Sequence, residues 1–349
     1  MKEINPQSPV LVTGASGYVA SWVVKELLEK GHTVHATVRN LSNKQRFEHL
    51  LRLEDQTPGT LKMFEADLMQ LGSFQEAMKG CELVIHTASP FFLKVKDAQK
   101  QLIDPALKGT RNVLQSANET SSVKRIVLTS SVAAVYGDAA DIQEIPGGAA
   151  NEENWNHSSS LTHQPYSYSK TLAEKEAWKM VGEQDQWDLV VINPGFIMGP
   201  SLTKRTDSIS IDFMRSMGSG KFRMGLPHLC FGIVDVRDVA KAHLQAGFLP
   251  QASGRHITVA ESMATLEMAS LLGKTFGDKY SLPKSYLPKF LIYLFGPLQG
   301  FTWKYVKRNV GYSLNFDNSY SKKDLQMEYL PVEQTLVEHL RQLERDGLL

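Results

Sequence analysis

The chain has 349 residues, of which 42% are hydrophobic and 21% are charged, and its formal net charge at pH 7 is +1. This composition is typical of a globular protein that buries a large core, either as one large domain with an added part or as two domains. The balanced charge argues against a nucleic-acid or anionic-membrane partner, because those partners need concentrated basic charge.

Cysteine content and apolar tracts indicate the compartment. Cys81 and Cys230 form neither a CxxC pair nor a disulfide framework, so we expect a reducing, cytoplasmic compartment. The N-terminal residues lack the long apolar run of a signal peptide. The most apolar tract, residues 286–303, is interrupted by proline, glycine and polar residues. We expect it to be a buried or pocket-lining helix and loop, not a membrane span.

Short apolar runs alternate with amphipathic segments through the first half of the chain. The first run is followed by GASG and then by a helix that ends at Lys30-Gly31, a basic residue and a capping glycine. Ser73 and Glu76 have capping-box spacing, which predicts a short helix ending at Gly80. Longer helices are predicted at 104–118 and 166–181. Strands are predicted at 9–13, 32–38, 60–67, 82–88, 125–131 and 188–194.

This alternation predicts the α/β class, with a Rossmann-type doubly wound parallel sheet. The alternation stops at Glu261, after which the sequence has the pattern of helices and aromatic loops. We therefore predict a dinucleotide-binding domain formed by residues 1–195 and 232–260. A smaller substrate-binding domain is predicted from residues 196–231 and 261–349.

The stretch TGASGYVA (13–20) follows the first strand and begins the first helix. Gly14 and Gly17, with Ala20 at the third position of the motif, let the backbone approach a pyrophosphate without an intervening Cβ. The first N–H groups of the helix then point at the phosphates. In this strand–turn–helix context the motif predicts a dinucleotide cofactor.

The end of the second strand indicates which dinucleotide is bound. An NAD enzyme usually has Asp or Glu here for the ribose 2′-hydroxyl, whereas this chain has Arg39. The charge and forked donors of arginine suit a 2′-phosphate, so we predict NADP(H). Lys44 and Arg46 could add to the phosphate site, and the sequence does not choose between them.

Tyr166 and Lys170 are four residues apart, so on a helix they share one face. A lysine ammonium beside a tyrosine hydroxyl favours the phenolate and lowers the tyrosine pKa, which makes Tyr166 a candidate proton donor or acceptor. Tyr168 points to another face. A second YxxxK pair, Tyr280 and Lys284, contains a proline, so we do not expect those two side chains to share a helix face.

Two serines, Ser130 and Ser131, end the fifth predicted strand, at the edge where open α/β sheets bind ligands. With them the chain resembles an extended short-chain dehydrogenase/reductase of the branch that contains dihydroflavonol and cinnamoyl-CoA reductases. The matching motifs run in order from residue 13 to residue 243. They are TGASGYVA (13–20), ATVRN (36–40), ADL (66–68), HTASP (86–90), GTRNVL (109–114), LTSSVAAVYG (128–137), YSYSK (166–170), NPGFIMGP (193–200) and VDVRDVAKAH (234–243).

The resemblance implies a role for each matched position. Ser131, in preference to Ser130, would hold the substrate carbonyl. Tyr166 would donate the proton, and Lys170 would bind the ribose hydroxyls and lower the Tyr166 pKa. The residues expected to bind the cofactor are Gly14, Ser16, Gly17, Tyr18, Val19, Arg39, Asp67, Leu68, Thr87, Ala88, Ser89, Tyr166, Lys170, Pro194 and Ile197. Those expected to border the nicotinamide or the substrate include Phe196, Pro90, Phe91, Phe92 and part of 201–231.

The expected activity is reduction of an aldehyde or ketone to the alcohol by NADPH, without a metal. The phenylalanines and apolar tail suggest a bulky apolar or aromatic substrate. The stretch HQPYSYSK departs from the NWYCYGK-type stretch of cinnamoyl-CoA reductases, which argues against a CoA thioester. Relatives are usually dimers, which leaves a homodimer open.

Three alternatives keep the same fold. They are a hydroxysteroid-type dehydrogenase, a sugar-nucleotide epimerase or dehydratase, and a non-catalytic NADP-sensing regulator. Arg39 argues against the epimerase, because those enzymes generally hold NAD. The complete set of Ser131, Tyr166 and Lys170 argues against the sensor.

Other polar residues have structural interpretations. His157 and His163 flank a serine-rich segment, and because their spacing fits no metal-ligand pattern, we expect a surface loop. The DVRD run at 235–238 is expected to fix a loop and to cap a helix that begins near Val239.

Overall fold

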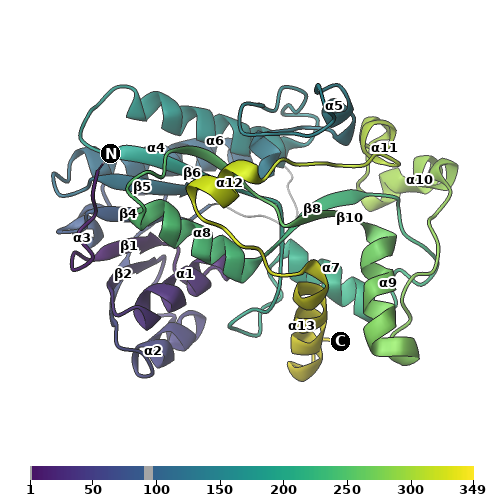
Figure 1. The fold of residues 1–349 in the computed structure, drawn as a ribbon, viewed down its shortest axis with the longest axis horizontal. Coiled ribbons are helices and arrows are strands. Elements are labelled where there is room, and N and C mark those ends of the chain that lie inside the picture. The colour runs from purple at the N-terminus through teal and green to yellow at the C-terminus, as the bar shows by residue number, and fades with distance from the viewer. Residues whose placement is uncertain (1, 90–96) are drawn as a thin grey trace.

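A seven-stranded parallel sheet, with helices around it, lies at the centre of the larger part of the molecule (Figure 1). The computed structural model describes residues 2–89 and 97–349, so the predicted substrate contacts Pro90, Phe91 and Phe92 lie outside the described residues. The strand order is β3-β2-β1-β4-β5-β6-β9, which is the order of a Rossmann-type doubly wound sheet and confirms the predicted fold class. The strands are β1 (Val10–Thr13), β2 (Thr33–Val38), β3 (Thr60–Glu65), β4 (Leu83–His86), β5 (Arg125–Thr129), β6 (Asp188–Pro194) and β9 (Gly254–Thr258).

The central strands are buried on both faces because helices cover both sides of the sheet. All residues of β1 and β4 are buried, as their continuous apolar sequence predicts. The strands predicted at 60–67, 82–88 and 125–131 each end two residues earlier in the structure. At those points the chain leaves the sheet at its carboxyl edge, and the polar residues that follow become available for a site.

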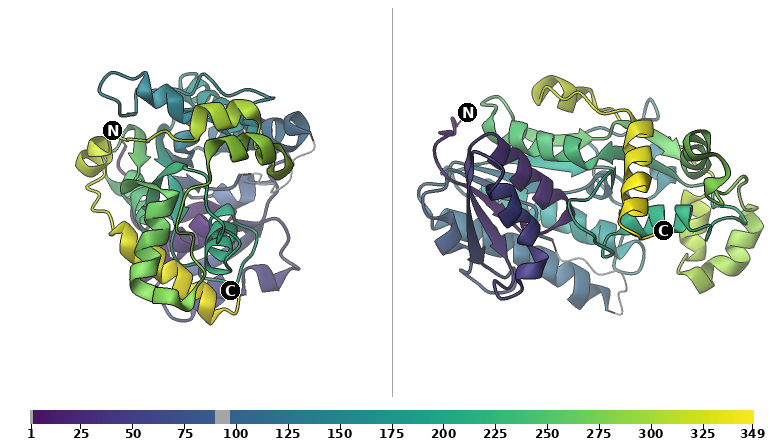
Figure 2. Two further views of the ribbon diagram at one scale, coloured as in Figure 1. Left: turned by 90° about the vertical axis from the view of Figure 1, so that its right-hand side faces the viewer. Right: turned by 90° about the horizontal axis from the view of Figure 1, so that it is seen from below.

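Two helix pairs flank the large sheet (Figures 1 and 2). On one face α1 (Tyr18–Glu29) packs against α8 (Val236–Phe248), and on the other α4 (Asp104–Asn118) packs against α6 (Pro165–Val181). The predicted helix 104–118 is confirmed, and α6 begins one residue before its predicted start. Shorter elements in this part are η1 (Lys44–Arg46), α2 (Glu48–Glu54), α3 (Gln75–Met78), η2 (Gln99–Ile103), η3 (Val132–Ala134) and α5 (Ala139–Gln143).

The predicted capping box of α3 is wrong. Helix α3 begins at Gln75, and no side chain caps it. Instead, the Ser73 hydroxyl donates to the Asp67 carbonyl at 2.8 Å and accepts from the Asp67 N–H at 3.2 Å. The serine therefore fixes the turn after β3, because serine hydroxyls compete readily for nearby backbone groups.

A second sheet lies beside the large one and was not predicted as strands. Its order is β10-β8-β7, formed by β7 (Phe196–Met198), β8 (Cys230–Asp235) and β10 (Glu261–Ala264). Helices α7 (Ile209–Gly218), α9 (Thr265–Phe276) and α13 (Val332–Arg345) share an apolar core with it. The chain leaves the large sheet after β6 and returns to it at β9. The division into two domains at the predicted boundaries remains a prediction.

The tract 286–303 is not the buried segment that we expected. It contains α10 (Lys289–Phe295) and η5 (Gly296–Gln299), and α11 (Trp303–Asn309) follows directly, with η4 (Gly277–Lys279) before it and α12 (Ser319–Asp324) after it. Phe290, Leu294 and Trp303 are 67%, 65% and 69% exposed. The helices are so short that only one face of each, around Ile292 and Val306, is buried. Among the described residues no helix is both long and apolar enough to cross a membrane.

Candidate active site

The glycine loop between β1 and α1 is closely packed. Gly14 has a φ of +65°, and a Cβ at this residue would lie 3.0 Å from the Cβ of Ala88. The N–H of Gly17 donates to the Gly14 carbonyl at 2.8 Å, and a Cβ on Gly17 would lie 3.1 Å from that oxygen. Only glycine fits both positions without strain. Helix α1 begins directly after this turn, so its first N–H groups are available for an anion.

The segment after β4 is bound to the end of β1. The Thr87 hydroxyl donates to the Thr13 carbonyl at 2.5 Å, and the Ala88 N–H donates to the Thr13 hydroxyl at 3.1 Å. The Ser89 hydroxyl in turn accepts a hydrogen bond from the Lys170 ammonium at 3.3 Å. These contacts connect the glycine loop with the predicted catalytic lysine through three consecutive residues.

The remaining predicted cofactor residues follow other strands at the same carboxyl edge. Arg39 is exposed directly after β2, and the described residues give it no ion-pair partner. The Asp67 carboxylate after β3 accepts from the Met69 N–H at 2.7 Å. Leu68 lies close against Gly109 of α4, where an added Cβ would be 3.1 Å from the Leu68 Cβ. The Tyr18 hydroxyl donates to the Gly199 carbonyl at 2.6 Å. The others are Ser16 in the glycine loop, Val19 in the first turn of α1, Pro194 at the end of β6 and Ile197 in β7.

Tyr166 and Lys170 lie one turn apart on α6, as predicted. Tyr166 is 40% exposed, whereas Tyr168 is half-buried. The other YxxxK pair is not helical, since Tyr280 follows η4 and Lys284 lies in an irregular segment, which confirms that it was a chance match.

Ser131 is the residue that caps η3. Its hydroxyl accepts from the Ala133 N–H at 3.1 Å and reaches the Pro194 carbonyl at 3.5 Å. The Thr171 hydroxyl on α6 reaches the Ala133 carbonyl at 3.5 Å, so α6 and η3 are held against each other. Within the described part of the chain, no hydrogen bond joins Ser131 to Tyr166 or to Lys170.

The alternative serine, Ser130, points elsewhere. It is buried, and its hydroxyl donates a short hydrogen bond to the Glu174 carboxylate, which lies one turn beyond Lys170 on α6. Glu174 is 1% exposed and also accepts from Asn193 at 2.8 Å and from Arg255 at 2.5 Å. Glu174 was not among the predicted site residues, although its spacing of four residues from Lys170 places both on one face of the helix. Because the Ser130 hydroxyl is held in this buried network, Ser131 stays our prediction for the serine that binds a substrate.

Burial controls the titration of the candidate catalytic pair. It lowers the pKa of Lys170 to about 8, and the Glu174 carboxylate opposes that shift. Although the Tyr166 side chain as a whole is 40% exposed, desolvation raises the pKa of its hydroxyl to about 12. Burial is the cause of this shift, so the lowering of the Tyr166 pKa by Lys170 that we expected stays a prediction. Burial and the positive charge of Lys170 also lower the pKa of His86 to about 3, so this imidazole is neutral.

Two polar groups that we interpreted as structural occupy different places from those predicted. His163 is not in a surface loop: it is 4% exposed, and its Nε2 lies 2.9 Å from the Asp138 carboxylate. Among the described residues no group of three or more His, Cys, Asp or Glu could hold a metal ion. Asp235 does cap a helix, accepting from the Arg237 N–H at 2.8 Å, but that helix, α8, begins at Val236.

Comparisons with known proteins agree with this geometry. Residues 10–260 match the NAD dependent epimerase/dehydratase family. The chain is 39% identical over 297 residues to cinnamoyl-CoA reductase CAD2 of Medicago truncatula, covering 82% of this chain and 88% of that protein. It is 37% identical over 287 residues to an anthocyanidin reductase of Vitis vinifera, covering 79% of this chain and 82% of that protein.

Solved structures extend the likeness to nearly the whole chain. Gre2 from Candida albicans in complex with NADPH superposes with a TM-score of 0.79 at 28% identity, covering 97% of this chain and 99% of that one. Yeast methylglyoxal/isovaleraldehyde reductase Gre2, also complexed with NADPH, superposes with a TM-score of 0.78 at 26% identity, covering 98% of this chain and 100% of that one. The chain thus belongs to the NAD dependent epimerase/dehydratase family of extended short-chain dehydrogenases/reductases, in the branch of the dihydroflavonol and cinnamoyl-CoA reductases.

Proposed function

We propose that the protein is an NADPH-dependent reductase that converts an aldehyde or ketone to the alcohol. The observation that carries the proposal is the contact between Lys170 and Ser89 at 3.3 Å, which joins the Tyr166 face of α6 to the segment bound to the glycine loop. A proton donor and a dinucleotide cradle at one sheet edge suit carbonyl reduction. The similarity to plant and yeast reductases supports the same reaction.

The residues present suit a dinucleotide. The glycine loop is so closely packed that a Cβ at Gly14 or Gly17 would press on Ala88 or on the Gly14 carbonyl, and the first turn of α1 offers N–H donors to a pyrophosphate. Arg39, exposed and without an ion-pair partner among the described residues, suits the 2′-phosphate that distinguishes NADPH from NADH. The residues proposed to hold the cofactor are Gly14, Ser16, Gly17, Tyr18, Val19, Arg39, Asp67, Leu68, Thr87, Ala88, Ser89, Tyr166, Lys170, Pro194 and Ile197.

The bound nicotinamide supplies the hydride, and three side chains do the remaining work. Ser131 donates a hydrogen bond to the carbonyl oxygen and holds it for attack. Tyr166 donates the proton, because a phenol with a pKa of about 12 is protonated at neutral pH. Lys170, charged below its pKa of about 8, stabilises the phenolate that forms and binds the ribose hydroxyls.

The substrate class is proposed to be apolar or aromatic. Phe196 of β7 packs against Phe213 of α7 and Phe231 of β8, with ring centroids 5.5 Å and 5.1 Å apart. Ile197, the proposed neighbour of the nicotinamide, follows Phe196 in β7 but points to the opposite face, toward the core of the large sheet, so the aromatic cluster supports the apolar class only through its composition. A cytoplasmic location and a homodimer are also proposed. The first is supported by the free thiols of Cys81 and Cys230 and the second by family resemblance alone.

The test is loss of NADPH absorbance with a panel of aliphatic and aromatic aldehydes and ketones, with NADH in parallel. Tyr166→Phe is the critical variant, and Tyr168→Phe, two residues away on the same helix, is its matched control. Turnover that Tyr168→Phe retains and Tyr166→Phe loses, with NADPH binding intact in both, supports the reductase. Equal turnover in wild type and Tyr166→Phe would refute the role of Tyr166, whereas tight NADPH binding without turnover in any protein favours the sensor.

A further inference from the structure

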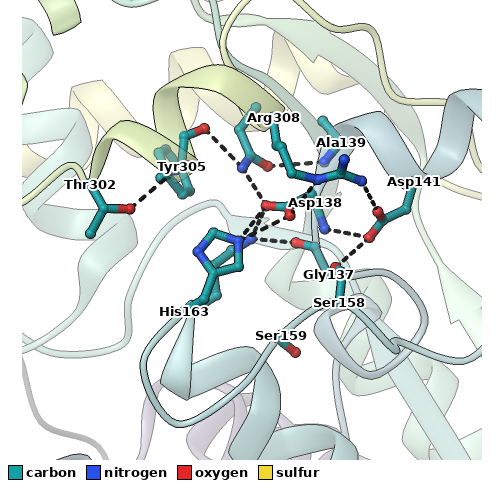
Figure 3. Close-up of polar contacts among 12 residues, drawn as sticks. Gly137, Asp138, Ala139, Asp141, Ser158, Ser159, His163, Thr302, Tyr305 and Arg308 are labelled. Atoms are coloured by element: carbon teal, nitrogen blue, oxygen red, sulfur yellow. Dashed lines mark hydrogen bonds and ion pairs between the residues drawn. The ribbon is translucent and has the colours of Figure 1, made fainter.

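A buried polar cluster surrounds the chain where it enters α6 (Figure 3). Its centre is Asp138, which has no exposed surface, although it lies in the polar segment just before α5. The His163 Nε2 lies 2.9 Å and 3.0 Å from the two carboxylate oxygens. Three other side chains donate to the same carboxylate: Gln164 at 2.7 Å, Arg308 at 2.9 Å and Asn309 at 2.6 Å.

Arg308 connects this cluster to a distant part of the chain. It belongs to α11, and besides Asp138 its guanidinium binds the Asp141 carboxylate of α5 at 2.5 Å. Asp141 in turn accepts from the Asp138 N–H at 2.8 Å and from the Ser158 hydroxyl at 2.5 Å. A charge-assisted network of this kind, centred on buried carboxylates, holds its members in one arrangement.

The cluster fixes the two residues that immediately precede the helix. Gln164 has left-handed backbone angles, φ 53° and ψ 56°, which cost a non-glycine residue about 1 kcal/mol. Its side chain compensates by donating to the Gly137 carbonyl at 2.6 Å as well as to Asp138. His163 is held at its backbone too, by exchange of hydrogen bonds with Ser160 at 2.8 Å and 3.2 Å.

Tyr166 depends on these contacts because of its position in the helix. It is the second residue of α6, and the first N–H groups of a helix have no intrahelical partner. Pro165 before it has no N–H at all. The path of the chain into the helix is therefore set from outside, by the side chains of Gln164 and His163 and by their common acceptor, Asp138.

We infer that Asp138, His163, Gln164 and Arg308 are positioning residues for Tyr166, and that through Arg308 helix α11 sets the placement of the proton donor. This inference rests on the proposed function. A displacement of about 1 Å at the reacting groups can lower a rate by about a hundredfold. Loosening the cluster is expected to slow proton transfer far more than it weakens NADPH binding, because the glycine loop and Arg39, proposed to hold the pyrophosphate and the 2′-phosphate, lie on other elements.

The critical variant is His163→Leu, which removes the donor to Asp138, and His163→Gln restores a donor. A matched control exists elsewhere: His256 of β9 is also buried, and its Nε2 lies 2.7 Å from the Asp324 carboxylate. His256→Leu removes the same kind of pair, so both leucine variants are expected to melt at lower temperature by similar amounts.

Four quantities are measured in full-length protein: kcat, the NADPH dissociation constant, the melting temperature and the solvent deuterium isotope effect on kcat. For His163→Leu we expect kcat to fall by roughly tenfold to a hundredfold and the isotope effect to rise, with NADPH affinity within twofold of wild type. His163→Gln should recover most of kcat. Arg308→Lys, which loses the fork that joins Asp138 to Asp141, should fall between them.

Each outcome decides the question. If kcat and the isotope effect of His163→Leu match those of His256→Leu, the cluster is only structural and the inference is overturned. The same holds if His163→Leu loses NADPH affinity in step with kcat. Failure of the proposed function looks different, because it would show as turnover retained in Tyr166→Phe.

Discussion

The glycine loop and the start of α6 are built in different ways. At the loop, contacts of the backbone hold the structure: Gly14 and Gly17 pack against neighbouring backbone and Cβ atoms, and the Thr13 carbonyl binds the segment after β4. At the start of α6, hydrogen bonds between buried side chains hold the structure, and Arg308 donates to them from α11, near the end of the chain. A region built from backbone is encoded locally, whereas one built from side chains depends on distant residues.

The largest effect is expected when a single side chain is added to the glycine loop. Gly14→Val places a branched Cβ 3.0 Å from Ala88 at a φ of +65°. We expect the backbone strain and the close contact to cost about 3 kcal/mol of binding free energy, which corresponds to a loss of about a hundredfold in NADPH affinity. Titration of NADPH fluorescence measures it. Gly31→Asn is the control, because Gly31 also has positive φ but nothing lies within 4 Å of its missing Cβ.

The next effect concerns a side chain beside the glycine loop, Arg39 directly after β2. Arg39→Asp should reverse the preference between NADPH and NADH without abolishing binding. Loss of a charge-assisted contact of about 2 kcal/mol corresponds to about thirtyfold in the ratio of the two kcat/KM values. An unchanged ratio would move the 2′-phosphate contact to Lys44 or Arg46, and their alanine variants would identify which.

A third prediction uses pH to test the side-chain-built region. Lys170 is charged below its pKa of about 8 and neutral above it, so kcat/KM should fall as pH rises through about 8, by up to tenfold per pH unit. Glu174 raises that pKa, so Glu174→Gln should move the fall to lower pH. Glu176→Gln, two residues further along α6 and paired with Arg111 at 2.7 Å, is the control that should leave the profile in place.

The smallest effect concerns a buried carboxyl outside both regions. Burial raises the pKa of Asp238 in α8 to about 6, so its charged form destabilises the folded protein above that pH and not below its ordinary pKa. Asp238→Asn keeps an acceptor for the Leu330 N–H, now at 2.9 Å. We expect it to stabilise the protein by about 1 to 2 kcal/mol at pH 7.5 and not at pH 4. Urea unfolding at the two pH values measures this, and equal effects at both would contradict it.

The sequence was sufficient to predict the features that depend on local pattern. Strands β1 to β6, the glycine loop and the Tyr166–Lys170 face all follow from periodicity, glycine spacing or a helical turn. Strand β9 was missed because only one of its five residues, Ile257, is a large apolar residue, and Arg255 and His256 are titratable. Arg255 is buried because it pairs with the Glu174 carboxylate, 81 residues earlier, and His256 is buried because it bonds the Asp324 carboxylate.

The same limit explains the errors around His163 and the 286–303 tract. His163 has the sequence surroundings of a surface loop, and only its pairing with Asp138, 25 residues earlier, buries it. The apolar tract was expected to be buried because of its composition, yet burial also requires a partner surface. In the structure that surface covers Ile292 and leaves Phe290 and Leu294 exposed.

The interleaving of the two sheets has a consequence for synthesis. Strand β6 pairs with β5 on one side and with β9 on the other, and β7 and β8 are made between them. As the chain emerges from the ribosome, β6 is therefore an open apolar edge until residues 254–258 appear, and open edges invite pairing with other chains. A fragment ending near residue 195 should therefore aggregate instead of folding. A chimera that takes its predicted substrate-binding part from a relative would have to replace residues 196–231 and 261–349 together.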